Sequence, residues 1–309
     1  MKVVFLDKKT LGDDMDFSMF DEFGDVVYHD ATSSKETLQR VKDADIVVTN
    51  KVVIDKNILD NSDIKLICVA ATGINNIDLD YAKQKGVVVK NVAGYSTSSV
   101  VQLTFAMALY HINNINHFDS YTKSDEGWVK SDVFTNFTPT FFDIAGKRWG
   151  IIGLGEIGKG VAKVAQAFGL EVCYYSTSGK NSSSEYKRVE LKELLKTSDI
   201  ISIHAPLNKD TKDLINSTNL PLLKDKVILL NLGRGGIINE KDLADFIDSS
   251  SIKVALDVLE KEPIADNSPF YALRNKQNLL MTPHLAWASI ESRTRLLKGI
   301  YKNIKEYLS

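Results

Sequence analysis

The stretch WGIIGLGEIG, Trp149–Gly158, decides the fold. An apolar run ends at Ile152 and is followed by three glycines in the pattern Gly153-Leu-Gly155-Glu-Ile-Gly158, after which the helical pattern KGVAKVAQAFG begins. Three glycines at this spacing are weak evidence when they stand alone, because glycines cluster in many turns. Here a strand precedes them and an amphipathic helix follows, which is the context that makes the pattern specific. The stretch therefore predicts the first strand, turn and helix of a dinucleotide-binding fold.

Each glycine of this turn has a separate physical reason. Gly153 allows the tight turn, Gly155 lets the backbone approach a pyrophosphate, and Gly158 lets helix and strand pack closely. The backbone N–H groups of Glu156 and Ile157 are then predicted to face phosphate at the positive end of the helix. A glycine-bearing turn that binds no ligand is the alternative interpretation.

The end of the next strand bears on the choice of cofactor. An acid that holds the adenosine ribose is expected there, about 20 residues after the glycines. This chain has Ser176 instead, within YYSTSGK. A hydroxyl removes the charge that would repel a 2′-phosphate, and Lys180 is placed to attract one, but no arginine follows directly. The sequence predicts NAD as the cofactor and leaves NADP open.

Working outward, short β-rich runs alternate with helical patterns along the whole chain, which predicts parallel sheets covered by helices. Five strands are predicted before the glycine motif: Lys2–Leu6, Val26–His29, Asp45–Thr49, Lys65–Ala70 and Val87–Asn91. Six more are predicted from the motif onward: Arg148–Ile152, Glu171–Tyr175, Asp199–Ala205, Val227–Leu232, Lys253–Val258 and Leu279–Thr282.

Three further segments complete the expected organisation. A long helix is predicted to begin near Ser96 or Thr97 and to run through VVQLTFAMALYHINNI; it is apolar on more than one face, so it lies in a core or at an interface. Residues 118–143 show little periodicity and are interpreted as a linking stretch. The last helix, Ile290–Leu308, has no strand after it and is expected to pack on the first domain.

Length and composition set the broad class. At roughly 150 residues per domain, 309 residues predict two domains. Thirty-eight basic and 40 acidic residues leave a net charge of −2, which argues against a nucleic-acid partner. No stretch approaches the roughly 18 apolar residues of a membrane span, and the first apolar run meets Asp7 without a cleavage site. Cys68 and Cys173 lie in apolar runs and are expected to be buried thiols, and no metal-binding cluster is seen. We expect a cytoplasmic protein.

Three side chains with suitable chemistry follow strands of the second series, at the edge where open α/β sheets bind ligands. Arg234 offers a planar fork of donors for a carboxylate, or for a carboxylate and an adjacent carbonyl. His284 changes protonation near neutral pH, as a general acid or base must. Glu262 can bond the far ring nitrogen, which fixes the tautomer and favours the imidazolium. Taken singly, each has an ordinary alternative: a surface ion pair, a structural histidine and a turn residue.

Together with their motifs, these residues resemble the D-isomer-specific 2-hydroxyacid dehydrogenase family. The likeness is carried, in family order and spacing, by GKRWGIIGLGEIG, SIHAPLNKDTKDLI, LNLGRGGIIN, DVLEKEP and TPHLAW. The resemblance implies that Arg234, Glu262 and His284 form the catalytic set, Glu260 being excluded by the spacing before Pro263. Hydride passes between nicotinamide C4 and substrate C2, with His284 as proton donor during reduction.

The resemblance also implies two doubly wound parallel-sheet domains with a cleft between them. These are a flavodoxin-like substrate domain of residues 1–96 and 287–309, and a Rossmann NAD-binding domain of residues 97–286. Further cofactor contacts are implied at Thr97, Ala205, Pro206, Thr211, Leu232, Gly233 and Asp257, the last at the nicotinamide carboxamide. Substrate contacts are implied at Lys51, Thr72 and Gly73, besides Arg234 and His284.

Several alternatives stay open at this point. The segments Thr49–Lys51 and Gly94–Gln102 look most like the glycerate dehydrogenase (hydroxypyruvate reductase) branch, although a solvated Lys51 is equally compatible. Neither a regulatory domain nor a long N-terminal extension is expected. D-Lactate and branched 2-keto acids are neighbouring substrates, and an NAD(H)-sensing corepressor of this fold is the rival from another class. The aromatic-rich helix Leu103–Tyr110 is either core or the seam of the homodimer that the family forms.

Overall fold

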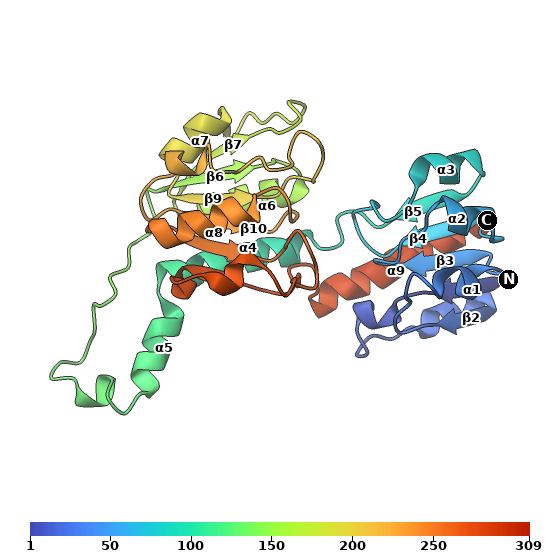
Figure 1. Cartoon of the computed structure of the whole chain (residues 1–309), viewed down its shortest axis with the longest axis horizontal. Coiled ribbons are helices and arrows are strands. Elements are labelled where there is room, and N and C mark those ends of the chain that lie inside the picture. Colours follow the sequence, from blue (N-terminus) through green and yellow to red (C-terminus); the bar gives the residue numbers. More distant parts are fainter. The chain divides into compact units, whose positions relative to one another are not determined.

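The computed structural model describes all 309 residues, and the chain divides into two compact units. Unit 1 comprises Met1–Ser96 and Trp287–Ser309, and unit 2 comprises Thr97–Ala286. Each unit is a parallel sheet with helices on both faces (Figure 1), so the α/β class predicted from the alternating pattern is confirmed.

Unit 1 is built on a five-stranded parallel sheet in the order β2-β1-β3-β4-β5. The strands are β1 (Lys2–Phe5), β2 (Asp25–Tyr28), β3 (Ile46–Thr49), β4 (Leu66–Val69) and β5 (Val88–Asn91). The central strands β3 and β4 are buried at every residue, because both of their faces are covered. All five strands predicted in this part of the sequence are present.

Separate apolar cores cover the two faces of this sheet. One core packs α1 (Thr37–Val41), α2 (Lys56–Asp60) and α3 (Leu79–Gln84) against the strands. On the other face lie the short 3₁₀ helices Lys8–Leu11 and Ser18–Phe23 and the C-terminal helix α9 (Ile290–Leu308). The apolar stripe of α9 packs on this sheet, which is why the last helix follows the strands of unit 2 without a strand of its own.

Unit 2 contains a seven-stranded parallel sheet in the order β12-β11-β10-β9-β6-β7-β8. Its strands are β6 (Arg148–Ile152), β7 (Glu171–Tyr175), β8 (Lys187–Arg188), β9 (Ile200–Ile203), β10 (Ile228–Asn231), β11 (Lys253–Leu256) and β12 (Leu279–Met281). The six predicted strands are present, and β8 was missed. With only two residues, both exposed, β8 has no apolar pattern from which to predict it.

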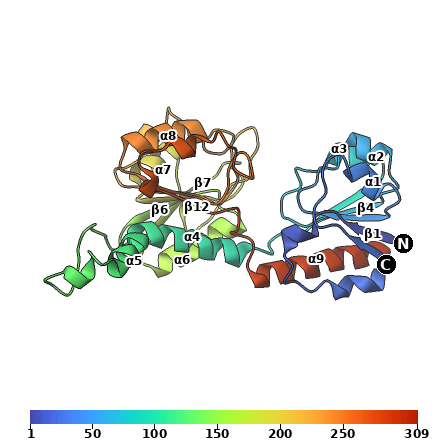
Figure 2. The same cartoon turned by 60° about the horizontal axis from the view of Figure 1, so that its bottom comes forward.

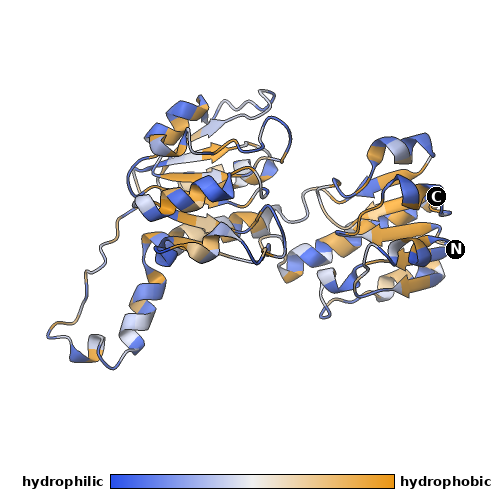
Figure 3. Cartoon of the chain, viewed as in Figure 1, coloured by the Kyte–Doolittle hydropathy of each residue, from blue (hydrophilic) through white to orange (hydrophobic).

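Helices also cover both faces of the larger sheet. On one face lie α4 (Thr97–Ile112) and α6 (Glu156–Ala167), and on the other α7 (Leu191–Thr197) and α8 (Glu240–Ser249) (Figure 2). Strands are apolar along their length, whereas the helices are apolar mainly on their inner sides (Figure 3). The 3₁₀ segments of this unit are Trp128–Lys130, Leu220–Leu222, Pro269–Ala272 and Lys276–Asn278. No helix of the chain has the length and apolar character needed to cross a membrane.

The sequence-based prediction was wrong about residues 113–123. The long helix ends at Ile112, because Asn114 adopts a left-handed backbone conformation with φ of 48°, which asparagine tolerates better than most residues. A separate helix, α5 (Ile115–Lys123), then begins at the last residue of the predicted long helix and runs into the stretch interpreted as a link. None of the residues of α5 is buried, so its pattern carried no core-facing signal. Residues 113–143, here called the arm, extend away from the sheet of unit 2 in both views (Figures 1 and 2).

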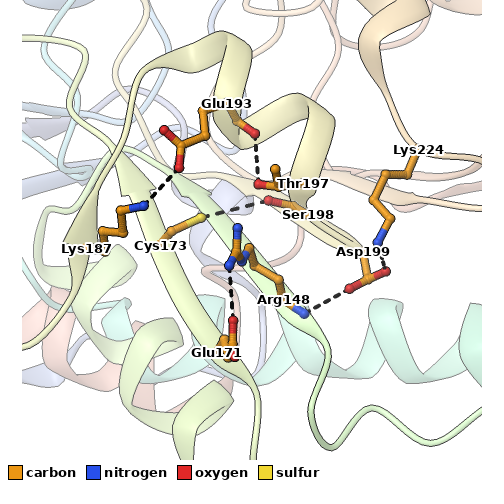
Figure 4. A network of polar contacts seen from close by, with 9 residues as sticks. All are labelled: Arg148, Glu171, Cys173, Lys187, Glu193, Thr197, Ser198, Asp199 and Lys224. Atoms are coloured by element: carbon orange, nitrogen blue, oxygen red, sulfur yellow. Dashed lines mark hydrogen bonds and ion pairs between the residues drawn. The ribbon is translucent and has the colours of Figure 1, made fainter.

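A polar network ties together the amino-terminal ends of three strands of unit 2 (Figure 4). Asp199, which precedes β9, accepts a hydrogen bond of 2.9 Å from the backbone N–H of Arg148 at the start of β6 and pairs with Lys224. The Arg148 guanidinium pairs at 3.2 Å with Glu171 at the start of β7. Ligands of such sheets bind at the opposite, carboxyl-terminal edge, so we assign this network to strand alignment.

Both cysteines are free and buried, as the sequence predicted. Burial raises the pKa of the Cys68 thiol to about 12 and also raises that of Cys173. Neither thiol is therefore a reactive thiolate at neutral pH.

Candidate active site

The candidate site lies at the carboxyl-terminal edge of the sheet of unit 2. The chain builds β6, β7 and β8 toward one side and then returns to place β9 on the other side of β6. Helices and loops therefore diverge between β6 and β9, and open α/β sheets bind their ligands at such a point of divergence.

The glycine turn occupies this point of divergence. Gly153 has a φ of 95°, and a Cβ there would lie 2.9 Å from the backbone nitrogen of Ala205. A Cβ on Gly158 would lie 2.2 Å from the carbonyl oxygen of Gly153, whereas one on Gly155 would meet nothing within 4 Å. Gly153 and Gly158 are thus required by close packing within the protein, and the open space at Gly155 leaves room for a ligand beside the first N–H groups of α6, at Glu156 and Ile157.

Two buried polar atoms on either side of the turn have no hydrogen-bond partner in the protein. They are the hydroxyl oxygen of Ser176, after β7, and the Nδ1 of His204, after β9. Only one other buried polar side-chain atom of the chain, Ser268 Oγ, also lacks a hydrogen-bond partner. Buried polar groups are nearly always bonded, so two such atoms at the ligand-binding edge fit a missing polar ligand. On this observation the residues present fit a dinucleotide.

The tautomer of His204 follows from its neighbours. The indole N–H of Trp149 can only donate, and it donates to Ser202 Oγ at 2.8 Å. Ser202 Oγ lies 3.0 Å from His204 Nε2, so its own proton is best used on that nitrogen. If Nε2 carried the proton instead, both the hydroxyl proton of Ser202 and the lone pair of His204 Nδ1 would lack a partner. With the proton on Nδ1, only the Nδ1–H lacks one. His204 therefore carries its proton on Nδ1, and burial lowers its pKa to about 3, which keeps the ring neutral.

The loop after β9 is shaped by the hydroxyl of Thr211. It donates to the carbonyl oxygen of Pro206 at 2.7 Å and accepts from the N–H of Asn208 at 2.8 Å. The buried Thr211 side chain thus closes its own loop and presents the backbone of Ala205 and Pro206 at the sheet edge. Among the other predicted cofactor contacts in this unit, Thr97 begins α4, and Leu232 is buried directly after β10.

Arg234 is presented by a tight turn after β10. The Asn231 side chain accepts from the N–H of Gly233 at 3.1 Å and donates to the carbonyl oxygen of Arg234 at 2.9 Å. A Cβ on Gly235 would lie 1.9 Å from the carbonyl oxygen of Leu259, so the loops after β10 and β11 touch backbone to backbone here. The turn that carries Arg234 therefore lies directly against the loop that carries Glu262.

Glu262 and His284 are bonded to each other. Glu262 Oε2 lies 2.6 Å from His284 Nδ1, and Oε1 accepts from the N–H of Leu259 at 3.0 Å. The two side chains are 32% and 22% exposed, so the pair is reachable from solvent. Glu260, the nearby acid, has no bond to the imidazole; its backbone N–H donates to Glu240, whose pKa is raised by burial and by the charges of Glu260 and Glu262.

His284 stands on a constrained loop held by Asp257. Its φ of 51° lies in the left-handed region, which few non-glycine residues adopt without support. The Asp257 carboxylate accepts from Thr282 Oγ1 at 2.6 Å and from the N–H groups of Leu285 and Ala286 at 2.9 Å each. Both oxygens of Asp257 are therefore engaged by the residues that flank His284. The geometry shows Asp257 as a loop anchor, and burial raises its pKa. Its contact with the nicotinamide stays a prediction.

The three predicted substrate contacts outside this sheet all belong to unit 1. Lys51 follows β3, and its N–H donates to Asp7 at 2.7 Å. Thr72 and Gly73 follow β4, with the Thr72 hydroxyl 3.3 Å from the carbonyl oxygen of Val92. These residues lie after the ends of neighbouring strands, as ligand-binding residues of such sheets do.

Comparison with known proteins identifies the family. Residues 105–286 match the model of the D-isomer specific 2-hydroxyacid dehydrogenase NAD binding domain. The chain is 36% identical to the hydroxypyruvate reductase of Blautia hydrogenotrophica, over all of this chain and 97% of the relative. It is 34% identical to the glycerate dehydrogenase of Methylorubrum extorquens, over all of this chain and 96% of that protein. The chain belongs to the D-isomer-specific 2-hydroxyacid dehydrogenases.

A solved structure agrees with this dehydrogenase fold. The D-lactate dehydrogenase of Aquifex aeolicus, complexed with NAD and lactic acid, superposes with a TM-score of 0.85 at 27% identity, over 99% of this chain and 95% of that one. The enzyme is thus an NAD-dependent 2-hydroxyacid oxidoreductase, and residues 105–286 lie in its NAD-binding domain.

Sequence reasoning missed the roles of four side chains that shape the site of this dehydrogenase. The Ser202–His204 pair was detectable in principle, because residues two apart on a strand share a face. Asn231 was quoted within its motif, but its bonds to the turn depend on the folded backbone. Arg188, which comes from the missed strand β8, donates to the carbonyl oxygen of Gly179 at 3.2 Å, near the end of β7.

Proposed function

We propose that this dehydrogenase interconverts D-glycerate and hydroxypyruvate. The observation that carries the proposal is the 2.6 Å bond between Glu262 and His284 beside the turn that presents Arg234. This arrangement supplies a proton donor and a carboxylate-binding cation at one sheet edge, as reduction of a 2-keto acid requires. The similarity to a hydroxypyruvate reductase and a glycerate dehydrogenase supports this choice among the 2-hydroxy acids.

In the direction of reduction, the three side chains have distinct tasks. Arg234 binds the substrate carboxylate and polarises the adjacent carbonyl. Glu262 accepts the Nδ1 proton of His284, so Nε2 is the nitrogen left to donate a proton to the keto oxygen. A bound nicotinamide supplies the hydride that the carbonyl carbon accepts. In oxidation, His284 Nε2 instead takes the hydroxyl proton.

The dinucleotide is held by groups of unit 2. Backbone N–H groups of Glu156 and Ile157, at the start of α6, face the pyrophosphate beyond Gly155. Ser176 would hold the adenosine ribose, and the Nδ1–H of His204 would donate to an oxygen of the dinucleotide, because both groups lack a partner in the protein. The remaining contacts of this unit in this proposal are Thr97, Ala205, Pro206, Thr211, Leu232, Gly233 and Asp257. In unit 1, Lys51, Thr72 and Gly73 contact the substrate.

We further propose that the enzyme is a cytoplasmic homodimer. Two buried free cysteines fit a reducing compartment.

Seven of the eighteen exposed large apolar side chains lie in the arm: Ile115, Trp128, Val129, Val133, Phe134, Phe137 and Phe141. Monomers rarely expose so much apolar surface in one segment, and a second copy of the chain covers it in this proposal. Light scattering of the full chain, with Phe134→Glu and Phe137→Glu combined as the test variant, checks the dimer.

Steady-state kinetics tests the substrate. Oxidation of NADH is followed with hydroxypyruvate, glyoxylate, pyruvate and 2-ketoisocaproate, and hydroxypyruvate is expected to give the highest kcat/KM. A higher value for another keto acid would leave the reaction class intact and reject the glycerate assignment. Binding of NADH without turnover of any keto acid would instead favour a dinucleotide-sensing protein.

A further inference from the structure

We propose that a cavity in unit 1 binds a small aliphatic α-amino acid in its zwitterionic form, and that this ligand competes with the substrate for Lys51. The cavity measures about 390 Å³ and is lined by two segments, residues 32–37 after β2 and residues 51–58 after β3. Thr72 and Gly73, the other substrate contacts proposed in this unit, do not line it. The binding stands on the cavity alone, whereas the competition rests on the substrate contact proposed above for Lys51.

The order of the strands explains why a cavity forms here. The sheet of unit 1 runs β2-β1-β3, so β1 lies between the two strands whose loops line the cavity. The connection after β1 packs on the opposite face of the sheet, as the 3₁₀ helices Lys8–Leu11 and Ser18–Phe23, and none of its residues lines the cavity. Sheets of this strand order bind ligands at the carboxyl ends of the strands, where neighbouring connections leave on opposite faces. The cavity lies at such a point of divergence.

One charge of each sign lines the cavity. Asp55 Oδ1 accepts from the N–H of Ile58 at 3.0 Å, which leaves Oδ2 for a ligand ammonium. The ammonium of Lys51 supplies the opposite charge, for a ligand carboxylate. Lys56, the next cation of this segment, does not line the cavity, and its Nζ lies 4.6 Å from the centre of the Tyr81 ring. A lining with one cation and one anion suits a zwitterion better than an ion of a single sign.

The uncharged part of the lining fits the rest of an amino acid. Asn57 Oδ1 accepts from the Asn61 side chain at 3.3 Å, so the N–H groups of the Asn57 amide remain for a carboxylate. Val52, Val53 and Ile58 form an apolar wall, and Val53 is 59% exposed. A short branched side chain, such as that of valine, removes this apolar surface from water. The volume is within the range of small-molecule sites, about 300–1,000 Å³.

Lys51 connects this cavity to the proposed reaction. Its backbone is fixed, because its N–H donates to the buried carboxylate of Asp7 at 2.7 Å. The side chain, rather than the loop, is therefore the part that responds to a ligand. A ligand carboxylate that engages the ammonium withdraws it from the substrate, so KM should rise while kcat stays unchanged.

NMR titration of the full chain, labelled at the methyl groups of valine and isoleucine, locates the ligand without any turnover. With L-valine, the methyl signals of Val52, Val53 and Ile58 should shift with a Kd on the order of 1 mM. Isovalerate, which lacks the ammonium, and isobutylamine, which lacks the carboxylate, should each bind about tenfold more weakly. Equal binding of the three compounds, shifts confined to unit 2, or no shift well above that concentration would overturn the proposal.

Two aspartate variants form a matched pair for the ammonium contact. Asp55→Asn keeps an acceptor for the N–H of Ile58 but loses the charge, so valine should bind about tenfold more weakly. Asp78→Asn is the control: Asp78 accepts from the N–H of Tyr81 at 3.0 Å in the same way, lies outside the cavity, and should leave the affinity unchanged.

A third variant blocks the cavity. Val53→Trp, at an exposed position, fills the space and should abolish binding of valine, with circular dichroism verifying that each variant is folded. Wild-type affinity in either Asp55→Asn or Val53→Trp would contradict the assignment of this cavity as the site.

Steady-state kinetics separates this proposal from the proposed reaction. Saturating valine should raise the KM for hydroxypyruvate severalfold at constant kcat, and the increase should disappear in Val53→Trp. Valine binding in an enzyme that does not reduce hydroxypyruvate would leave the site established and the substrate wrong. Reduction of hydroxypyruvate by an enzyme that does not bind valine would reject only the cavity site, and binding with an unchanged KM would reject the competition for Lys51.

Discussion

The two units use the same anchoring arrangement for different purposes. In unit 1, the buried carboxylate of Asp7, just after β1, accepts from the N–H groups of Asn50 and Lys51 in the loop after the neighbouring strand β3. In unit 2, the buried carboxylate of Asp257, just after β11, accepts from Leu285 and Ala286 in the loop after the neighbouring strand β12. Each aspartate thus fixes the loop after the next strand by charge-assisted bonds to its backbone.

The difference lies in what each fixed loop carries. The loop held by Asp257 contains His284, in a left-handed conformation and bonded to Glu262. The loop held by Asp7 contains Lys51, beside a cavity of about 390 Å³ that Thr32, Val52 and Asp55 also line. One parallel-sheet design therefore positions an imidazole–carboxylate pair in unit 2 and a lysine beside a cavity in unit 1. In both units the fold provides the rigid loop, and the side chain that the loop carries decides the chemistry.

The largest expected effect separates the two loops by kinetics. His284→Ala removes the proton donor, so kcat should fall roughly 10²- to 10⁴-fold while the affinity for NADH stays within about twofold. Lys51→Ala in unit 1 should raise KM and leave kcat nearly unchanged. If Lys51→Ala lowered kcat as much as His284→Ala does, the proposed difference in role between the two loops would be contradicted.

Acid should destabilise unit 2 more than unit 1. His111 in α4 is buried, its Nε2 lies 2.8 Å from the carbonyl oxygen of Val254, and burial lowers its pKa to about 4. Since the unfolded chain takes up the proton near pH 6.5, stability is lost as the pH falls from about 6.5 toward 4, by about 3 kcal/mol for this group. His204 acts in the same direction.

Amide hydrogen exchange at pH 7 and pH 5 measures this difference unit by unit. Protection of the β6, β9 and β10 strands should decrease more than protection of β1, β3 and β4. His111→Gln should reduce the loss in unit 2, whereas His117→Gln, on the exposed helix α5, should not. An equal loss in both units would remove His111 as the cause.

The anchors themselves should matter about equally for stability and unequally for catalysis. Replacing either aspartate by asparagine weakens several buried bonds, so Asp7→Asn and Asp257→Asn should each cost roughly 1–3 kcal/mol in urea unfolding. Only Asp257→Asn should also lower kcat, because it loosens the loop that positions His284. Unchanged kcat in Asp257→Asn would show that the left-handed conformation of His284 is held by other contacts.

The pH dependence of these variants has a defined sign. Burial raises the pKa of both aspartates, so the folded state holds the proton to higher pH than the unfolded chain, where the ordinary value is 3.8. Stability contributed by each aspartate therefore falls as the pH rises through its folded pKa. The advantage of wild type over each asparagine variant should shrink from pH 4 upward, and a growing advantage would contradict the raised pKa.

The smallest effect is expected at the exposed edge of the larger sheet. Lys187→Gln removes the surface ion pair with Glu193, and exposed pairs of this kind contribute little. The Tm should change by no more than about 2 °C in differential scanning calorimetry. A larger decrease would mean that the edge strand β8 supports the sheet as the buried anchors do.

Local patterns in the sequence determined the fold class and much of the site. Strand runs such as Ile228–Asn231 are apolar because both faces of a parallel sheet are buried, so they are visible without a structure. Gly158 is dictated by its close approach to the carbonyl oxygen of Gly153, five residues earlier, which a spacing pattern records. Arg234, Glu262 and His284 were predicted as the catalytic set because each follows a strand within a motif.

Only the tertiary structure decided which distant groups meet. Asp7 bonds to Asn50 from 43 residues away, and Asp257 bonds to Leu285 from 28 residues away. β8 and the break at Asn114 were missed because neither has an apolar repeat; a two-residue edge strand and one left-handed residue leave almost no pattern. Arg188 reaches Gly179 only because β8 pairs with β7. Sequence periodicity records which residues are buried, whereas the partner of a buried polar group is fixed by how strands are ordered in the sheet.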